Sequence, residues 1–137
     1  MQDFVLDAWP VLEWLEARQP VVAHMRRLLD ANDRRDCRLS INIVNLGEVF
    51  YMSVKRRGLA HARRVVESLQ TRLITISADD ELVLLAANLK ARHPISYADG
   101  FAAATAILHN VPLVTGDPEL RAMAANETAL QLEWIGR

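Results

Sequence analysis

Short apolar runs alternate along the chain with longer segments in which apolar residues recur at helical spacing. Five such runs predict strands, at residues 4–6, 39–41, 73–76, 112–115 and 130–135. Between them, apolar residues three or four positions apart predict helices that each bury one face. Strands that alternate with helices are typical of a parallel sheet covered on both sides. The pattern therefore predicts an α/β fold of three layers, with a central, mainly parallel sheet of four to five strands.

Capping residues and helix breakers predict where the helices begin and end. Pro10 opens the first helix, and either Asn42 or Asn45 caps the helix that follows the second strand. Ser77 is expected to cap the helix after the third strand, and Ser96 the helix that runs to residue 108. The chain has no linker, internal repeat or low-complexity tract, so we expect its 137 residues to form a single domain.

Composition narrows the class of protein. Apolar residues make up 51% of the chain and charged residues 24%, which excludes a disordered or collagen-like protein. The net charge of −1 excludes a strongly basic nucleic-acid coat but is compatible with a local basic patch. Cys37 is the only cysteine, so it cannot form an internal disulfide and is expected to be an incidental residue.

The sequence predicts neither a targeting segment nor a membrane span. The longest uncharged stretch, residues 100–116, is interrupted by Asn110 and Pro112 and is shorter than the ~20 apolar residues that a span needs. Asp3 and Asp7 stand near the N-terminus, where a signal peptide carries Lys or Arg. We therefore expect a cytoplasmic protein without membrane contact, in the reducing compartment that a lone cysteine favours.

Four carboxylates fall where an α/β sheet places its functional site. Asp7 and Asp117 each end a predicted strand, and such sheets bind ligands at the carboxyl ends of their strands. Glu48 and Asp99 lie early in helices whose other residues are mostly apolar or small. The helix dipole alone accounts for Asp99, with a stabilisation of ~0.3–1 kcal/mol. It does not account for Asp7 and Asp117, since a lone carboxylate in an apolar context is costly unless it is paired or bound to metal.

A cluster of these four acids favours a divalent cation. No Lys or Arg is adjacent to any of them in the sequence, so their negative charges repel one another unless a cation lies between them. Oxygen ligands without His or Cys indicate Mg²⁺ or Mn²⁺ rather than zinc. The sequence therefore predicts a magnesium or manganese site at the carboxyl ends of the strands.

Four segments that span nearly the whole chain resemble the PIN-domain family, and in particular its VapC-type toxins. They read FVLDAWPVLEWL, LSINIVNLGEVFY, ISYADGFAAATAILHN and PLVTGDPEL. The resemblance implies a PIN-like fold whose pocket gathers an acidic catalytic quartet, and the matching residues are Asp7, Glu48, Asp99 and Asp117, with Glu119 at the place of a further acid. It also implies Mg²⁺- or Mn²⁺-dependent cleavage of RNA by a toxin that an antitoxin protein silences and that typically forms a homodimer.

Each acid has an expected role in that reaction. Hydrolysis of a phosphodiester needs an activated water and neutralisation of the charge on the phosphoryl oxygens, which one or two metal ions supply. We expect Asp7, Asp99 and Asp117 to bind the metal, directly or through water. Glu48 either binds through water or orients the attacking water.

The chain departs from the family pattern directly after the first acid. The family usually places Ser or Thr there, whereas this chain has Ala8 and Trp9. The hydroxyl contribution is therefore either lost or supplied by Ser40 or Thr115. Thr115 and Ser96 lie close to the acids as auxiliary site residues, although Ser96 is explained more simply as a helix cap. Trp9 either stacks on a base at the rim of the pocket or packs on the first helix.

Every formal charge between Glu48 and Glu67 is positive. We call the cations in this segment the basic strip, and its members are Lys55, Arg56, Arg57, Arg63 and Arg64. Because nucleic-acid affinity is mostly electrostatic, the basic strip is the candidate RNA-binding surface. The alternatives are a solvated helix face, an antitoxin interface and a dimer interface.

Other function classes fit the sequence less well. A receiver-like domain needs a Lys after a late strand, and this chain has none beyond Lys90. A haloacid-dehalogenase-like phosphatase needs an acid two residues after the first Asp, where Trp9 stands. The remaining alternative is a non-catalytic PIN-like module that binds RNA or protein. Ala8 favours that module, whereas the presence of all four acids favours the nuclease.

Overall fold

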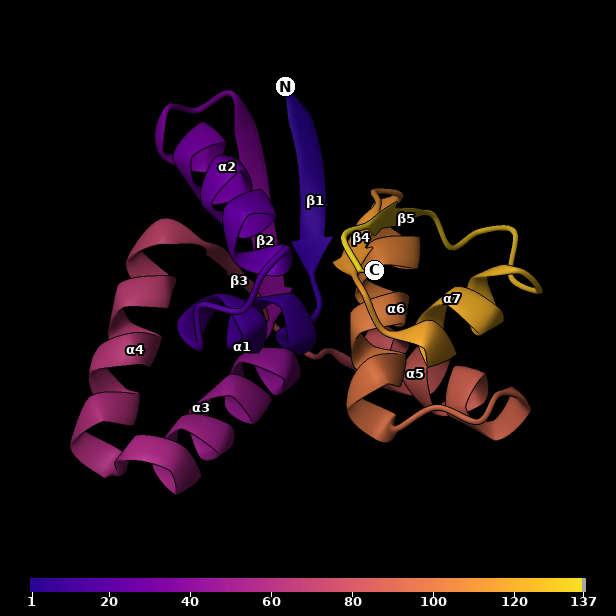
Figure 1. Ribbon diagram of the computed structural model, residues 1–137. Helices are drawn as coiled ribbons and strands as arrows, with labels where there is room; N and C mark the ends of the chain where they lie inside the picture. The colour runs from indigo at the N-terminus through magenta and orange to yellow at the C-terminus, as the bar shows by residue number, and fades with distance from the viewer. Residues whose placement is uncertain (137) are drawn as a thin grey trace.

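The computed structural model describes residues 1–136, in which five parallel strands form one sheet in the order β3-β2-β1-β4-β5 (Figure 1). The strands are β1 (Gln2–Leu6), β2 (Cys37–Asn42), β3 (Ile74–Ile76), β4 (Leu113–Thr115) and β5 (Leu132–Trp134). The chain first adds strands on one side of β1 and then crosses to add β4 and β5 on the other side. The strand order therefore reverses between β1 and β4, and an α/β sheet opens a crevice at such a point.

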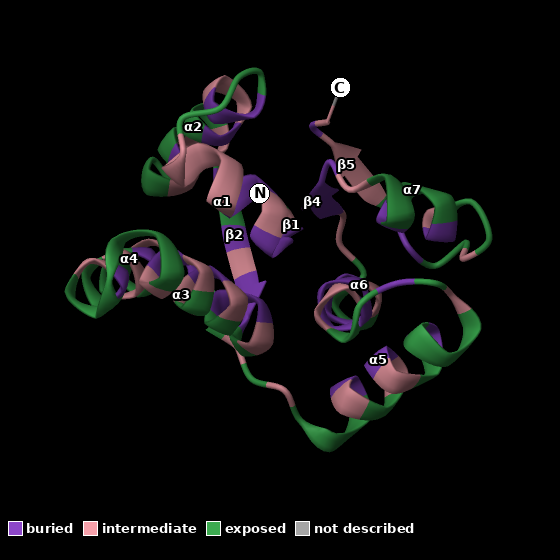
Figure 2. Ribbon diagram, turned by 60° about the horizontal axis from the view of Figure 1, so that its bottom comes forward, coloured by how far each residue is buried: buried purple, intermediate pink, exposed green. Residues whose placement is uncertain are grey.

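Helices cover both faces of this sheet. They are α1 (Ala8–Leu15), α2 (Val21–Asp33), α3 (Ile43–Arg57), α4 (Leu59–Arg72), α5 (Asp80–Arg92), α6 (Tyr97–His109) and α7 (Pro118–Ala124). One buried cluster joins the sheet to α1, α2, α3 and α4, and a second joins it to α5, α6 and α7 (Figure 2). The predicted three-layer α/β fold is confirmed, with five strands that are all parallel.

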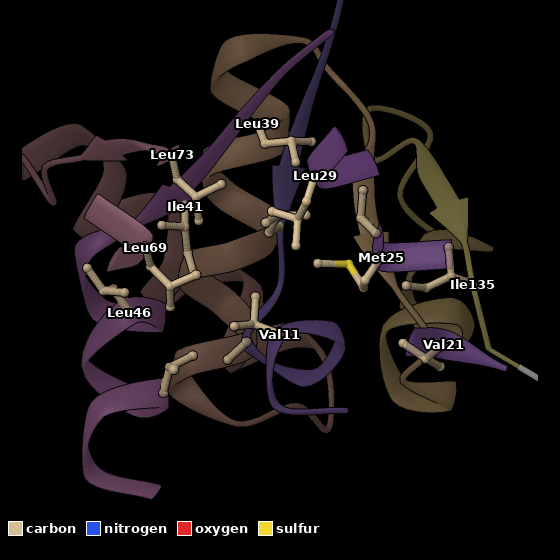
Figure 3. Close-up of a cluster of buried hydrophobic side chains, with 14 of the residues drawn as sticks. Val11, Val21, Met25, Leu29, Leu39, Ile41, Leu46, Leu69, Leu73 and Ile135 are labelled. Atoms are coloured by element: carbon tan, nitrogen blue, oxygen red, sulfur yellow. The ribbon is translucent and has the colours of Figure 1, made fainter. Parts of the chain in front are cut away.

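The two clusters differ in how closely their helices approach the sheet. In the first, branched side chains such as Val11, Leu39 and Ile41 interdigitate between the strands and the helices (Figure 3). In the second, buried alanines let α6 lie directly against the sheet, and a Cβ on Gly100 would come within 2.9 Å of a carbonyl oxygen of α5. Small residues on α6 therefore hold its first turn close to the strand ends.

The observed N-caps show where three of the predicted helices begin. Asp7 caps the first helix by accepting from the Ala8 N–H, so this helix begins before Pro10, which lies in its first turn. Asn42 rather than Asn45 caps α3. The prediction of Ser77 as a cap was wrong. Asp79 caps α5 instead and accepts from the Leu82 N–H at 3.0 Å, because the helix begins at Asp80 and leaves Ser77 three residues before its start.

A further feature bears on the class of protein. Within residues 1–136, no helix combines the length and the hydropathy that a bilayer crossing demands.

Cys37 lies buried on β2, and burial raises the pKa of its thiol. A buried thiol of this kind is unreactive, which agrees with the incidental role expected for Cys37.

Candidate metal centre

The predicted acids meet at the carboxyl ends of β1 and β4. Asp7 follows β1 as the N-cap of α1, and Asp117 follows β4 as the N-cap of α7. Glu48 lies in the second turn of α3 and Asp99 in the first turn of α6. Figure 2 shows α1, α3, α6 and α7 arranged around the ends of these two strands. Four chain segments far apart in the sequence thus each bring one carboxylate to the point where the strand order reverses.

Asp7 is the innermost acid. Its side chain is buried, with the Oδ1 atom accepting from the Ala8 N–H at 2.9 Å and the Oδ2 atom accepting from the Thr115 hydroxyl at 2.8 Å. Burial raises the pKa of Asp7 to about 8, with further increases from the negative charges of Asp99, Glu48 and Asp117. Without a cation, Asp7 therefore favours its protonated form at neutral pH.

Thr115 connects two of the acids. Its Oγ1 atom donates to Asp7 and accepts from the Asp117 N–H at 3.1 Å. The contact follows from the parallel register, in which Leu6 pairs with Val114 and the next residues lie side by side. Of the two hydroxyls proposed to replace the one missing at Ala8, Thr115 therefore contacts Asp7. Ser40 does not, because it lines a groove farther back on the sheet with Ile74.

Three of the other acids form a tighter outer group. Oxygen atoms from the carboxylates of Asp99, Asp117 and Glu119 all lie within 4.8 Å of one another. Burial raises the pKa of Asp99, and the negative charges of Asp117 and Glu119 raise it further. Burial also raises the pKa of Glu48, with smaller contributions from Asp99 and Asp117. The tightest group thus contains Glu119 in addition to Asp99 and Asp117, whereas the sequence predicts Asp7 as the third metal ligand.

Two of these carboxylates also accept hydrogen bonds from backbone N–H groups at the starts of helices. Asp99 and Ser96 form a reciprocal capping box at the start of α6, in which the Ser96 Oγ atom accepts from the Asp99 N–H at 3.1 Å. Asp117 accepts from the Glu119 N–H at 2.9 Å. The simpler explanation of Ser96 as a helix cap therefore holds. These bonds fix the carboxylates in place before any ligand arrives.

The donor set fits a hard divalent cation. The site offers five carboxylates, and no Lys, Arg or His within residues 1–136 forms an ion pair with any of them. Burial raises the pKa values of Asp7, Glu48 and Asp99, repulsion from neighbouring carboxylates raises them further, and a bound cation would relieve this repulsion. Oxygen donors of this kind are the preferred ligands of Mg²⁺ and Mn²⁺.

Asn45 belongs to the site although the sequence analysis weighed it only as a helix cap. It is fully buried, and its Nδ2 atom donates to the Ala98 carbonyl at 2.9 Å. This bond joins α3, one turn before Glu48, to α6, one residue before Asp99. Its Oδ1 atom has no partner among the residues that the structure describes. The signal in the sequence is a polar residue three positions before Glu48, which places both on one helix face.

The basic strip lies at the other end of α3. Lys55, Arg56 and Arg57 form its last turn, where cations favour the helix dipole, and Arg63 and Arg64 lie on α4. All five residues are exposed, although the Arg56 side chain is partly covered. Arg56 and Arg57 reach the Glu16 carboxylate at 3.4 and 3.9 Å, so part of the positive charge of the basic strip is neutralised. Eight residues of helix, or about 12 Å, separate Glu48 from Arg56.

The fold and the acids define an α/β protein with a carboxylate cluster, a candidate metal site, at the switch point of its sheet. A family model described as PIN domain matches residues 4–126, so the chain belongs to the PIN-domain family. This confirms the resemblance seen in the sequence. PIN domains are in general metal-dependent nucleases. No match to this chain was found among curated proteins.

Chains of known structure share the fold at low sequence identity. One is from DNA-bound VapBC of Salmonella typhimurium, with 20% identity, a TM-score of 0.75 and coverage of 97% of this chain and 98% of that chain. Another is from VapBC2 of Rickettsia felis bound to promoter DNA, with 18% identity, a TM-score of 0.73 and coverage of 98% and 99%. A third, from VapBC-1 of Haemophilus influenzae, has 17% identity, a TM-score of 0.70 and coverage of 97% and 98%.

Replacing Thr115 with Val is expected to destabilise the protein by about 1–3 kcal/mol, because Asp7 and the Asp117 N–H each lose a buried partner. Urea unfolding in EDTA measures this change in the free energy of unfolding. The control is Thr128→Val at an exposed position, which should change stability by no more than ~0.5 kcal/mol. Equal stability of Thr115→Val and the parent protein would contradict the structural role of this hydroxyl.

Proposed function

We propose that this chain is a VapC-type toxin that hydrolyses RNA phosphodiester bonds as a Mg²⁺- or Mn²⁺-dependent endoribonuclease. The observation that carries the proposal is the convergence of five carboxylates, without a paired cation among the described residues, at the switch point of the sheet. Membership of the PIN-domain family supports the nuclease chemistry. The VapBC structures with the same fold support the toxin assignment.

The acids divide into ligands and a group that handles the attacking water. Asp99, Asp117 and Glu119 would hold the ion, with Asp7 behind them as an additional ligand once it loses its proton. An ion bound there activates water and neutralises charge on the phosphoryl oxygens. Glu48 is only partly buried, and its raised pKa suits a group that accepts a proton from the attacking water. Thr115 and Ser96 position Asp7, Asp117 and Asp99 through the hydrogen bonds described above.

A groove between α1 and α4 suits the antitoxin partner. Trp14, Leu15, Val65 and Leu69 line a cavity of about 220 Å³ there, beside His61 and Arg64. An apolar groove between helices is the kind of surface that takes an amphipathic peptide segment. One similar structure is described as a toxin–antitoxin complex from Klebsiella pneumoniae, which supports an antitoxin for this chain. We further propose a homodimer in the cytoplasm.

Cleavage of a mixed RNA pool tests the nuclease activity. The purified protein should shorten the RNA in Mg²⁺ or Mn²⁺ and leave it intact in excess EDTA. A pool that stays intact with both metals, although the protein binds it, would support a non-catalytic PIN-like module instead. Cleavage at an unchanged rate in EDTA would refute the metal dependence.

Growth after induced expression tests the toxin role separately. Expression of the chain should stop growth, and co-expression of a short neighbouring gene for an antitoxin should restore it. Growth that continues although the purified protein cleaves RNA would show a nuclease that is not a toxin.

Charge reversal in the basic strip is expected to weaken RNA binding. The double variant Lys55→Glu/Arg63→Glu removes two exposed cations that form no ion pair among residues 1–136, whereas reversal of Arg56 or Arg57 would also place a Glu beside Glu16. The slope of log affinity against log salt should fall by roughly one for each lost phosphate contact.

The matched control for this prediction is Arg26→Glu/Arg27→Glu, which makes the same change in net charge at exposed positions of α2. Fluorescence anisotropy of a labelled RNA over a series of salt concentrations measures both affinities. Equal losses of affinity in the two double variants would mean that the basic strip contacts no phosphate. The remaining uses of the strip would then be a protein interface or a solvated surface.

A further inference from the structure

A cavity of about 290 Å³ lies beside the metal centre and is used by none of the chemistry above. It is bounded by α1, the start of α2 and β5, and its walls include Trp9, Glu13, Pro20 and Trp134. Gly116 and Pro118, the residues on either side of Asp117, are also among its lining residues. Trp9 itself follows Asp7 by two residues. Two chain segments therefore connect the lining of the cavity with the carboxylate cluster.

Two glycines hold the indole rings at the wall of this cavity. A Cβ on Gly116 would lie 2.3 Å from the Trp9 Cζ3 atom, and a Cβ on Gly136 would lie 2.6 Å from the Trp134 Cζ2 atom. The two glycines also touch each other, since the Gly116 Cα atom lies within 3.0 Å of the position of a Gly136 Cβ. Each indole ring therefore packs directly against the backbone of a glycine. This contact keeps both rings at the wall of the cavity.

The two rings remain partly exposed although they are the largest side chains in the region. Trp9 packs on Gly116 in addition to its own helix, so packing on the first helix is only part of its role. Trp134 has the Arg121 guanidinium 4.6 Å from its ring centroid, which places a positive charge over one face of this indole. An aromatic wall next to a cation offers stacking for a flat ring and attraction for a phosphate.

We propose that this cavity binds one nucleobase of the RNA beside the bond that is cut, with the base stacked on Trp9 and the Trp134 ring beside it in the cavity wall. The proposal rests on the ribonuclease function proposed above. The acid cluster recognises no base, whereas stacking on an aromatic side chain contributes ~1–3 kcal/mol per base in single-stranded nucleic acids. The Glu13 carboxylate, held by Arg18 at 2.9 Å, lies at the wall as an acceptor for N–H groups on the base edge.

Indole N–H resonances test the site without any need for cleavage. The chain has three tryptophans, so a ¹⁵N-labelled sample gives three indole signals that single Trp→Phe variants assign. Addition of AMP should move the Trp9 and Trp134 signals in a saturable way, and the Trp14 signal, which belongs to the α1–α4 groove, should stay in place. Ribose 5-phosphate, which lacks a base, should move none of them.

Three results would overturn the base site. The first is the absence of any shift with AMP, and the second is equal shifts with ribose 5-phosphate. The third is an AMP shift at Trp14 alone, which would place the nucleotide in the groove assigned to the antitoxin.

Cleavage of modified RNA separates failure of the base site from failure of the nuclease function. Single abasic nucleotides are placed in turn along a short RNA, and kcat/KM is measured for the parent protein and Trp9→Leu. Trp9→Leu should lower kcat/KM for intact RNA roughly tenfold, and it should have no further effect on the RNA that lacks the recognised base. A thermal melt shows whether Trp9→Leu is folded, and Trp9→Phe, which keeps an aromatic ring, should retain most of the parental kcat/KM.

Equal losses on every RNA would overturn the base site while the nuclease function stands. Base-dependent indole shifts from a protein that never cleaves RNA would support the base site and refute the nuclease function.

Discussion

Asp99→Asn is expected to leave the protein folded and to lower RNA cleavage by about a thousandfold or more. Asn preserves the shape of Asp99, and its carbonyl oxygen can still accept from the Ser96 N–H in the capping box. It removes the negative charge that holds a hard cation. It also relieves repulsion, because Asp99 raises the pKa values of Asp7 and Glu48. Melting in EDTA should therefore occur at the temperature of the parent protein or above it.

Asp7→Asn is expected to show the same loss of cleavage with stability unchanged or increased. The matched control for both variants is Asp30→Asn, at an exposed position of α2 outside the site, which should cleave RNA at the parental rate. Cleavage time courses and thermal melts in EDTA measure the two properties on the same samples. A variant that melts well below the parent would mark its Asp as a structural residue. A stable variant with parental cleavage would remove that Asp from the catalytic set.

Added Mg²⁺ is expected to stabilise the protein, and the effect should grow as pH rises. At a concentration a hundredfold above Kd, binding to the native state contributes about 2.7 kcal/mol, or about 5–10 °C in Tm. The cation must displace protons, because the pKa values of Asp7, Glu48 and Asp99 are all raised. The increment from Mg²⁺ should therefore be small near pH 5 and largest at and above about pH 8, the pKa of Asp7.

The metal-free protein is expected to show the opposite dependence on pH. Groups with raised pKa values bind more protons in the folded than in the unfolded state, so their contribution to stability is fully present at low pH. It is lost as pH rises from the ordinary range of a carboxyl group through about 8, the pKa of folded Asp7. Thermal melts between about pH 5 and 8.5, in EDTA and in Mg²⁺, measure both trends.

The control for the metal prediction is Asp117→Asn, in which the increment from Mg²⁺ should shrink because one carboxylate of the outer group is gone. The Asp30→Asn protein should keep the full increment. An increment that is the same at every pH, or the same in Asp117→Asn as in the parent, would place the stabilising cation elsewhere on the protein.

Much of the fold was predictable because its determinants are local in the sequence. The short apolar runs and the helical spacing between them gave the alternation of strands and helices, and from it the parallel sheet and its three layers. The first residues of the helices were harder to predict, because several neighbouring polar residues could each act as the N-cap. Ser77 and Asp79 both precede α5, and only the three-dimensional path of the chain after β3 places Asp79 at the N-cap.

The convergence of Asp7, Glu48, Asp99 and Asp117 was predictable because each follows a strand or lies in the first two turns of a helix, and such positions converge in a parallel sheet. Contacts between distant residues were not. Thr115 and Asp7 are 108 positions apart, and their bond depends on the register of β1 with β4. The bond from Asn45 to Ala98 depends on how α3 packs against α6, and the place of Glu119 in the outer group depends on the turn that Asp117 caps.

Anomalous diffraction from crystals soaked in Mn²⁺ tests most directly whether these carboxylates form a divalent-cation site. We expect a strong anomalous peak bounded by the carboxylates of Asp99, Asp117 and Glu119, and no such peak in crystals of Asp117→Asn. A Mn²⁺ peak elsewhere on the protein, with none among these carboxylates at a concentration that supports RNA cleavage, would contradict the presence of this site.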